Sequence, residues 1–81
     1  MNITILPFAS VKDALGFASK KITVNSGATA GDVAAALAEE HSALAPLIET
    51  LLLAVNSAYV SSDEPLNDGD ELALFPPVSG G

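Results

Sequence analysis

The residues with the clearest chemical potential lie in the segment FPPVSGG at positions 75–81. Its two prolines stiffen the chain and project the residues that follow them. Gly80 and Gly81 lack Cβ atoms, so their backbone can pass through a narrow channel in another protein. Residues 78–81 reach about 13 Å when extended, which is enough to enter a partner's active site. The residues expected to insert in this way are Val78, Ser79 and Gly80.

The reactive group of this segment would be the α-carboxylate of Gly81. A terminal carboxylate is ionised near neutral pH. Because an ionised carboxylate is a poor electrophile, it must first be activated, for instance as an acyl-adenylate. We therefore expect the catalytic groups to belong to partner enzymes, while this chain carries a chemical group on Gly81.

Three other motifs are weaker candidates for chemistry. Gly27–Gly31 lacks the Lys-Ser/Thr ending of a phosphate loop and predicts a turn that leads into a helix. The acidic run at 63–71 places Leu66 where a calcium loop needs an oxygen ligand, so we expect a solvated acidic turn suited to a basic partner. His41 is the single histidine and is expected on the surface at a helix end. No metal site is predicted.

Composition limits the class of protein. The chain has 81 residues, enough for one domain, and 49% are hydrophobic, which excludes a disordered tail. The formal charge is −7, and the basic residues are Lys12, Lys20 and Lys21. So few cations cannot neutralise a row of phosphates, so neither nucleic acid nor an anionic membrane is expected as a partner. The acidic balance instead favours a basic protein partner. The absence of cysteine, of a basic leader and of a long apolar run predicts a cytoplasmic protein.

Alternation and turn residues predict the elements that position the tail. A first strand is expected from residue 2 to about Pro7, and Ser10 with Asp13 predicts a capping box for a short helix that stops at Gly16. The opening of the Ala-rich main helix is predicted by Thr29, with Asp32 in the capping-box position. A loop or short turn is expected at 44–50, and further strands at 21–24, 51–55, 59–60 and 71–75.

This order of elements predicts the α+β class, with one main helix packed on one face of a small mixed sheet. A β-grasp arrangement fits the order.

The first and last strands carry apolar side chains on both faces. Alternation places the Ile3–Ile5 pair and the Leu72–Leu74 pair on one face. If that face meets the helix, the opposite face is an apolar surface suited to a protein partner. The alternative, equally open, is that Phe8 and Phe75 complete the core because Pro7 shifts the register. The residues expected at a partner interface are Leu6, Phe8, Ala73, Phe75, Pro76 and Pro77.

Two segments resemble a known family. AVNSAYVSSDEPLNDGDELALFPPVSGG at 54–81 is similar to the C-terminal third of the small subunit of molybdopterin synthase, and ITILPFASVKDALG at 3–16 is similar to its first strand and short helix. The resemblance implies a ubiquitin-like β-grasp domain at 1–75 and an extended tail at 76–81. It also implies that Phe8 and Phe75 pack against a large subunit. Lys12 stands where the family often has Arg, so it cannot form the bidentate ion pair of an arginine.

The same resemblance implies a mechanism. An adenylating enzyme would use ATP to activate the Gly81 carboxylate, and a persulfide sulfur donor would convert it to a thiocarboxylate. The large synthase subunit, in a heterotetramer, would accept the tail and use this sulfur to build the dithiolene of molybdopterin. The chain would bind no cofactor and would not be catalytic by itself. The alternatives are a sulfur carrier for thiamine or another pathway, and a ubiquitin-like protein modifier.

Overall fold

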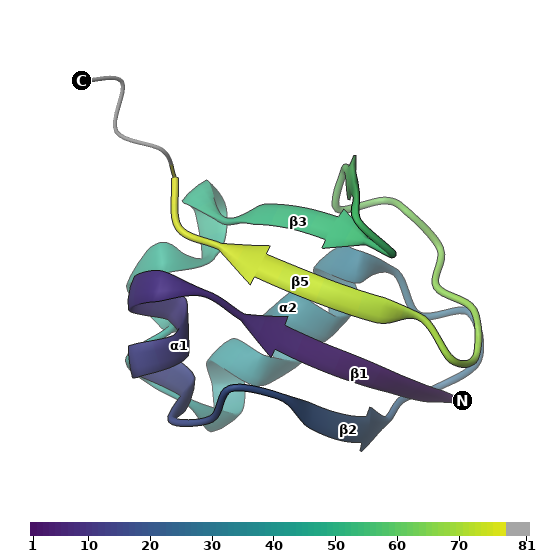
Figure 1. Ribbon diagram of the computed structural model, residues 1–81, viewed down its shortest axis with the longest axis horizontal. Helices are drawn as coiled ribbons and strands as arrows, with labels where there is room; N and C mark the ends of the chain where they lie inside the picture. The colour runs from purple at the N-terminus through teal and green to yellow at the C-terminus, as the bar shows by residue number, and fades with distance from the viewer. Residues whose placement is uncertain (78–81) are drawn as a thin grey trace.

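The computed structural model describes residues 1–77, which form a five-stranded sheet with its helices on one side and at one end (Figure 1). The predicted residues 78–81 of the tail lie outside the described part of the chain. The elements are β1 Asn2–Pro7, α1 Ala9–Leu15, β2 Lys20–Thr23, α2 Ala30–Glu40, the 3-10 helix η1 Ala45–Thr50, β3 Leu52–Val55, β4 Ala58–Val60 and β5 Glu71–Phe75.

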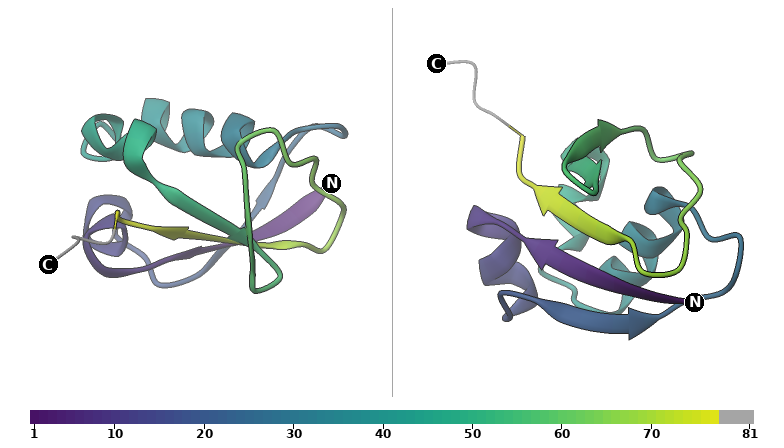
Figure 2. Two further views of the ribbon diagram at one scale, coloured as in Figure 1. Left: turned by 90° about the horizontal axis from the view of Figure 1, so that it is seen from above. Right: turned by 45° about the vertical axis from the view of Figure 1, so that its right-hand side comes forward.

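The sheet has the strand order β2-β1-β5-β3-β4. β1 and β5 pair in parallel at its centre, and the other pairs are antiparallel. Helix α2 and η1 lie on one side of this sheet, and α1 lies at its end (Figure 2). The predicted α+β class and the β-grasp arrangement are confirmed.

The core lies between the sheet and α2. Ile3 and Ile5 of β1 and the Leu72–Leu74 pair of β5 are at most 1% exposed. On α2, Val33 and Leu37 form the buried stripe that meets them, as their spacing of one turn predicts. Full burial of a large aliphatic side chain contributes about 1.5–3 kcal/mol, so this face of the sheet is the main source of stability.

The start of α2 is the predicted capping box. The Asp32 backbone N–H donates to Thr29 Oγ1 at 3.1 Å, and the Thr29 N–H donates to Asp32 Oδ2 at 3.0 Å. The Gly31 N–H donates to the Ser62 carbonyl at 2.8 Å, and a Cβ on Gly31 would lie 2.7 Å from Ser62 Cβ. The glycine motif is therefore a turn that leads into a helix, as predicted, rather than a phosphate loop. The structure adds a close backbone approach at Gly31 that the sequence did not predict.

The predicted capping box at α1 is wrong. Phe8 is the N-cap and no side chain caps the helix, which already includes Ser10. The cause is a main-chain bond, because the Phe8 N–H donates to the Leu74 carbonyl at 3.0 Å and the Phe8 carbonyl accepts from Val11 at 3.1 Å. The helix thus begins directly at the end of β1. The predicted stop at Gly16 is confirmed, with φ of 82° at that residue.

Residues 45–50 form a 3-10 helix, which is the short turn rather than the loop of the two predicted alternatives. Three strand boundaries need correction. β2 begins and ends one residue earlier than predicted, because Lys20 already pairs with Ile5. β3 begins at Leu52 and is fully buried only in its middle, since it lies beside a short edge strand. β4 includes Ala58, one residue before its predicted start.

The predicted solvated acidic turn is wrong for Asp70, whereas Asp68 is exposed as predicted. Asp70 is 8% exposed, and its carboxylate accepts from the Asn56 side chain at 2.9 Å and from the Asn67 N–H at 2.8 Å. Asp68 Oδ1 accepts from the Asn2 N–H at 2.6 Å. These oxygens satisfy backbone and amide donors of the loop, so they hold the turn against the sheet. The loop also buries Leu66 in the core.

Within residues 1–77, no helix combines the length and apolar character needed to cross a bilayer. The same residues contain no group of three or more His, Asp or Glu side chains placed to hold a metal ion.

Candidate partner-binding site

The structure decides the open question about the two faces of the sheet. The Ile3–Ile5 and Leu72–Leu74 pairs face α2, and Leu6 pairs with Ala73 on the opposite side. Pro7 ends β1 without shifting the register, because it still lies opposite Leu74. Phe8 and Phe75 are therefore on the outer face and do not complete the core. We define the outer-face patch as Leu6, Phe8, Ala54, Tyr59, Ala73 and Phe75.

Three aromatic rings form the most exposed part of this patch. The rings of Phe8 and Phe75 are stacked with centroids 4.6 Å apart and planes 8° apart. Tyr59 lies against Phe75 at 6.0 Å, with the rings tilted by 53°. Phe8 is 43% exposed and Tyr59 71% exposed. Such contacts contribute about 0.5–1.5 kcal/mol each, so the rings hold one another in place before any partner arrives.

The backbone after β1 directs Phe8 onto the outer face. Its N–H is bound to the Leu74 carbonyl, so Phe8 continues the line of β1 beside β5. The next residue, Ala9, has φ of 51° and turns the chain into α1. A non-glycine residue in this left-handed region costs about 1–2 kcal/mol. The fold accepts this strain where the aromatic stack is built.

A hollow of about 270 Å³ lies between these rings and the rest of the patch. The strand register places Leu6, Ala73, Ala54 and Tyr59 in one row across four strands. The two alanines are the small members of this row and form the floor, while larger side chains stand on either side. A partner's side chain can therefore enter the hollow without displacing any element of the fold.

Sequence reasoning missed Ala54 and Tyr59 as members of the patch. A signal for Tyr59 was present, since it is an aromatic residue in a short return strand after the Asn56-Ser57 turn. Its face followed only from the pairing of β3 with β4. Ala54 carries no sequence signal of its own, because an alanine in an apolar strand fits either face.

The Asn56-Ser57 turn and the side chain of Asn56 position the hairpin that carries Tyr59. Asn56 and Ser57 have positive φ values of 49° and 73°, typical of a tight two-residue hairpin turn. Asn56 Oδ1 accepts from the Glu71 N–H at 3.0 Å, and its Nδ2 donates to Asp70. The hairpin is thus tied to the start of β5, and Tyr59 is held beside the hollow.

The tail leaves the domain next to the patch. β5 ends at Phe75, at the end of the sheet beside α1 (Figure 1). Pro76 is half-buried and Pro77 is exposed. Val78, Ser79, Gly80 and Gly81, the predicted insertion segment and reactive residue, lie outside the described residues. The structure therefore brings the predicted sheet residues together, with Pro76 and Pro77 following Phe75 directly in the chain, and the last four positions stay a prediction.

Two other predicted positions take no part in the patch. His41 is the C-cap of α2, as expected for a helix-end residue, and its ring lies edge-on to Phe17 at 6.3 Å. It is half-buried rather than freely exposed. Lys12 is exposed on α1.

A mixed sheet that packs on one main helix, with the chain leaving beside an exposed aromatic patch, defines a ubiquitin-like β-grasp protein. The structure is similar to small archaeal modifier protein 1 of Haloferax volcanii, with 31% identity, a TM-score of 0.84 and 100% of both chains covered. A chain in the protein-protein complex of subunits 1 and 2 of molybdopterin-converting factor from Helicobacter pylori shares the fold at 23% identity and a TM-score of 0.70, with 100% of both chains covered.

Sequence comparison specifies the family. The profile of the ThiS family matches residues 5–81, so the chain belongs to the ThiS family. The chain is 36% identical to the molybdopterin synthase sulfur carrier subunit of Chlamydomonas reinhardtii, with 100% of each covered. It is also 35% identical to small archaeal modifier protein 1 of Haloferax volcanii, over 91% of this chain and 94% of the relative.

Proposed function

We propose that this chain is the sulfur-carrier subunit of molybdopterin synthase, and that Gly81 carries the sulfur as a terminal thiocarboxylate. The observation that carries the proposal is the position of the outer-face patch at the end of β5, where the tail begins. A partner bound to this patch receives the tail at its own surface. The match to the sulfur carrier subunit of Chlamydomonas reinhardtii over its full length supports the proposal.

The chemistry takes place in partner enzymes, and the only reacting group of this chain is the terminal carboxyl group of Gly81. In an adenylating enzyme, a Gly81 carboxylate oxygen attacks the α-phosphorus of ATP, and pyrophosphate leaves. The terminal sulfur of a persulfide attacks the carbonyl carbon, and AMP leaves. A thiol then cleaves the S–S bond of the acyl persulfide, which yields the thiocarboxylate and a disulfide. The chain itself supplies the acyl group and no catalytic side chain.

The larger partner is the other subunit of the synthase, in a heterotetramer that works in the cytoplasm. It covers the outer-face patch, with Phe8 and Phe75 as the aromatic anchors, and takes up the tail from Pro76 onwards. Aromatic anchors of this kind contribute most of the affinity in many interfaces. The formal charge of −7 favours a basic partner and speeds the encounter. The partner then uses the sulfur for the dithiolene of molybdopterin.

The proposal is tested at Gly81. Deleting Gly81 withdraws the terminal carbon by about 3.3–3.6 Å, far outside reacting distance. Extending the chain by one residue replaces the Gly81 carboxylate with an amide. Both variants should bind the large subunit with nearly unchanged affinity and yield no molybdopterin. Full product formation by the extended variant would overturn the proposal.

Gly81→Ala is the graded control in the same assay. It keeps the length and the carboxylate but adds a Cβ in a channel fitted to bare backbone. Binding should be little changed, and the rate of sulfur transfer should fall while staying measurable. A complete loss of binding in this variant would show that the tail, rather than the patch, supplies most of the affinity.

A second function, a ubiquitin-like protein modifier, is favoured by the similarity to small archaeal modifier protein 1. In that case the activated Gly81 carbonyl would be attacked by a lysine amine, with an isopeptide bond as the product. The two functions differ in the final acceptor, sulfur or nitrogen. Incubation with ATP, the adenylating enzyme and a persulfide donor should give the thiocarboxylate and no lysine-linked adducts.

A further inference from the structure

The two edges of the sheet carry different side chains. The edge strand β2 has exposed Lys20 and Lys21. Lysines on an edge strand discourage pairing with another chain. The other edge, β4, consists of Ala58, Tyr59 and Val60 and has no charged residue. One edge of this sheet is therefore protected against strand addition, and the other is not.

The register determines which backbone groups β4 offers to a neighbour. Val55 and Ala58 flank the two-residue turn, and Ala54 pairs with Tyr59 next to them. In an antiparallel hairpin of this kind the flanking pair is hydrogen-bonded and the next pair is not. The N–H and C=O of Tyr59 consequently point away from β3. They are a donor and an acceptor directed at the open edge.

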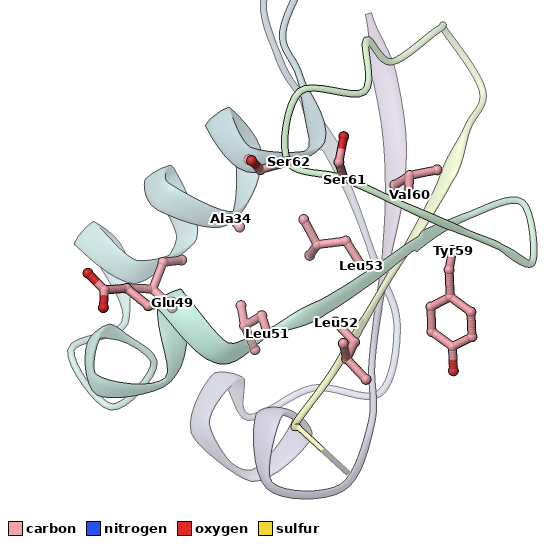
Figure 3. Close-up of a pocket in the computed structure, with 11 residues that line it drawn as sticks. Ala34, Glu49, Leu51, Leu52, Leu53, Tyr59, Val60, Ser61 and Ser62 are labelled. Carbon is pink, nitrogen blue, oxygen red and sulfur yellow. The ribbon is translucent and has the colours of Figure 1, made fainter.

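An apolar groove of about 530 Å³ lies beside this edge, between β3, β4, α2 and η1. Figure 3 shows Leu51 and Leu53 between Glu49 on one side and Tyr59 on the other. Ala34 of α2 lies on the helix side of the groove. The groove adjoins the edge on the inner side of the sheet, so it is distinct from the outer-face hollow, although Tyr59 borders both.

The charge distribution indicates the sign of the occupant. Glu49 is exposed at the rim of the groove. The three lysines lie on α1 and β2, and β2 is the opposite edge of the sheet. The formal charge of the chain is −7, so a positively charged segment is attracted to the β4 side and a negatively charged one is repelled.

We propose that the β4 edge and its groove bind an extended segment of a protein partner in which apolar and basic residues alternate. The segment adds as a strand beside β4 and exchanges hydrogen bonds with the backbone of Tyr59. An apolar side chain enters the groove over Leu53, and a lysine or arginine pairs with Glu49. This mode of binding uses the main chain for affinity and alternate side chains for specificity. It is independent of the sulfur-carrier proposal.

The probe is a short acetylated and amidated peptide of alternating valine and lysine, added to the whole chain and followed by amide NMR. The amides of residues 51–53 and 59–62 should shift, and a matched peptide of alternating valine and glutamate should cause no shifts there. Shifts confined to β2, equal binding of the acidic peptide, or no shifts with either peptide would each overturn the proposal.

Two substitutions at one position isolate the backbone contribution. Tyr59→Ala removes the ring and keeps the N–H, whereas Tyr59→Pro removes both without breaking a bond to β3. The proline variant should bind the basic peptide about threefold to tenfold more weakly than the alanine variant, the effect of one hydrogen bond. Glu49→Gln should weaken binding about twofold, as expected of an exposed ion pair. Equal affinities of the two Tyr59 variants would contradict strand addition.

If Tyr59→Pro does not fold, the peptide supplies the same test on the unmodified protein. Two versions of the valine–lysine peptide are N-methylated, one at its odd and one at its even positions. Each version lacks the N–H groups along one edge of the extended peptide. One version should bind as well as the parent peptide, and the other should lose binding. Equal binding of both versions would overturn the proposal.

Discussion

The two faces of the central strands differ in what their apolar side chains do. On the inner face, Leu72 and Leu74 are fully buried against α2. On the outer face, Leu6, Ala73 and Phe75 are half-buried, and no helix covers them within residues 1–77 (Figure 2). The same two strands, β1 and β5, supply both sets. The core uses only one face of the sheet, but both faces carry apolar side chains.

We infer that the inner face stabilises the fold and that the outer face binds a partner. The inner face contributes through burial in the native fold, while the outer face keeps apolar area exposed at a cost to solubility. Exposed apolar patches on small proteins mark interaction sites. Here the patch lies beside the exit of the tail, so recognition and chemistry are adjacent but use different residues. The predictions below test how cleanly the two faces divide these tasks.

The largest effect is expected on the inner face. Leu72→Ala should lower the free energy of unfolding by about 2–5 kcal/mol, because it leaves a cavity in the core. Leu6→Ala is the matched control on the outer face of the neighbouring strand and should cost about 1 kcal/mol, since Leu6 is only half-buried. Denaturant unfolding of both variants measures the difference. Equal losses would show that the two faces do not differ in their contribution to stability.

The next effect is expected in partner affinity. Phe75→Ala should weaken binding to the large subunit by about thirtyfold or more, the loss typical of an aromatic hot spot of 2 kcal/mol. The fold should persist, because Phe75 is only half-buried and lies outside the core. Affinity and thermal unfolding are measured on the same preparation. A collapse of stability with normal binding by the folded fraction would assign Phe75 to the core instead.

A smaller effect is expected when the hollow is filled. Ala73→Leu places a larger side chain on the floor between Leu6 and Ala54. It should weaken partner binding about tenfold, within the cost of overpacking of about 1–3 kcal/mol. Stability should change by less than about 0.5 kcal/mol. Ala35→Leu, on the exposed surface of α2, is the control and should leave binding unaltered; a loss in both variants would exclude a specific hollow.

The smallest effect concerns the strained first residue of α1. Ala9→Gly relieves a left-handed conformation that costs about 1–2 kcal/mol, and the greater flexibility of glycine offsets about 0.5–1 kcal/mol of this. We expect a net gain of a few tenths to 1 kcal/mol in the free energy of unfolding, with partner affinity unchanged. Ser10→Gly, inside the helix, should destabilise by about 0.5–1 kcal/mol. Destabilisation by both substitutions would contradict the strain.

Local interactions made part of this fold predictable from the sequence. The capping box of Thr29 and Asp32 joins residues only three positions apart. Along the strand Glu71–Phe75, successive side chains alternate between the buried and the outer face without interruption. Alternation along β5 showed that Phe75 lies opposite Leu74, but it left the core and an outer apolar surface as equal alternatives for Phe75. The structure decides for the outer surface, where Phe75 stacks on the exposed Phe8.

Long-range interactions made the rest unpredictable. Ser10 has good capping chemistry, but a main-chain bond from Phe8 to Leu74 begins the helix earlier. In the sequence, Asp70 cannot be distinguished from the neighbouring surface carboxylates, because its partner Asn56 lies beside it only in the folded structure. Tyr59 joins the patch through the pairing of β3 with β4. In each case the deciding neighbour is distant in the sequence.

The measurement that tests the central claim most directly is the intact mass of the chain after incubation with ATP, an adenylating enzyme and a persulfide donor. The account predicts that one oxygen atom is replaced by one sulfur atom, and that fragmentation places the replacement at Gly81. Lysine-linked adducts would support the modifier instead. An unchanged carboxylate on Gly81, with the sulfur absent or at another residue, would contradict the sulfur-carrier function.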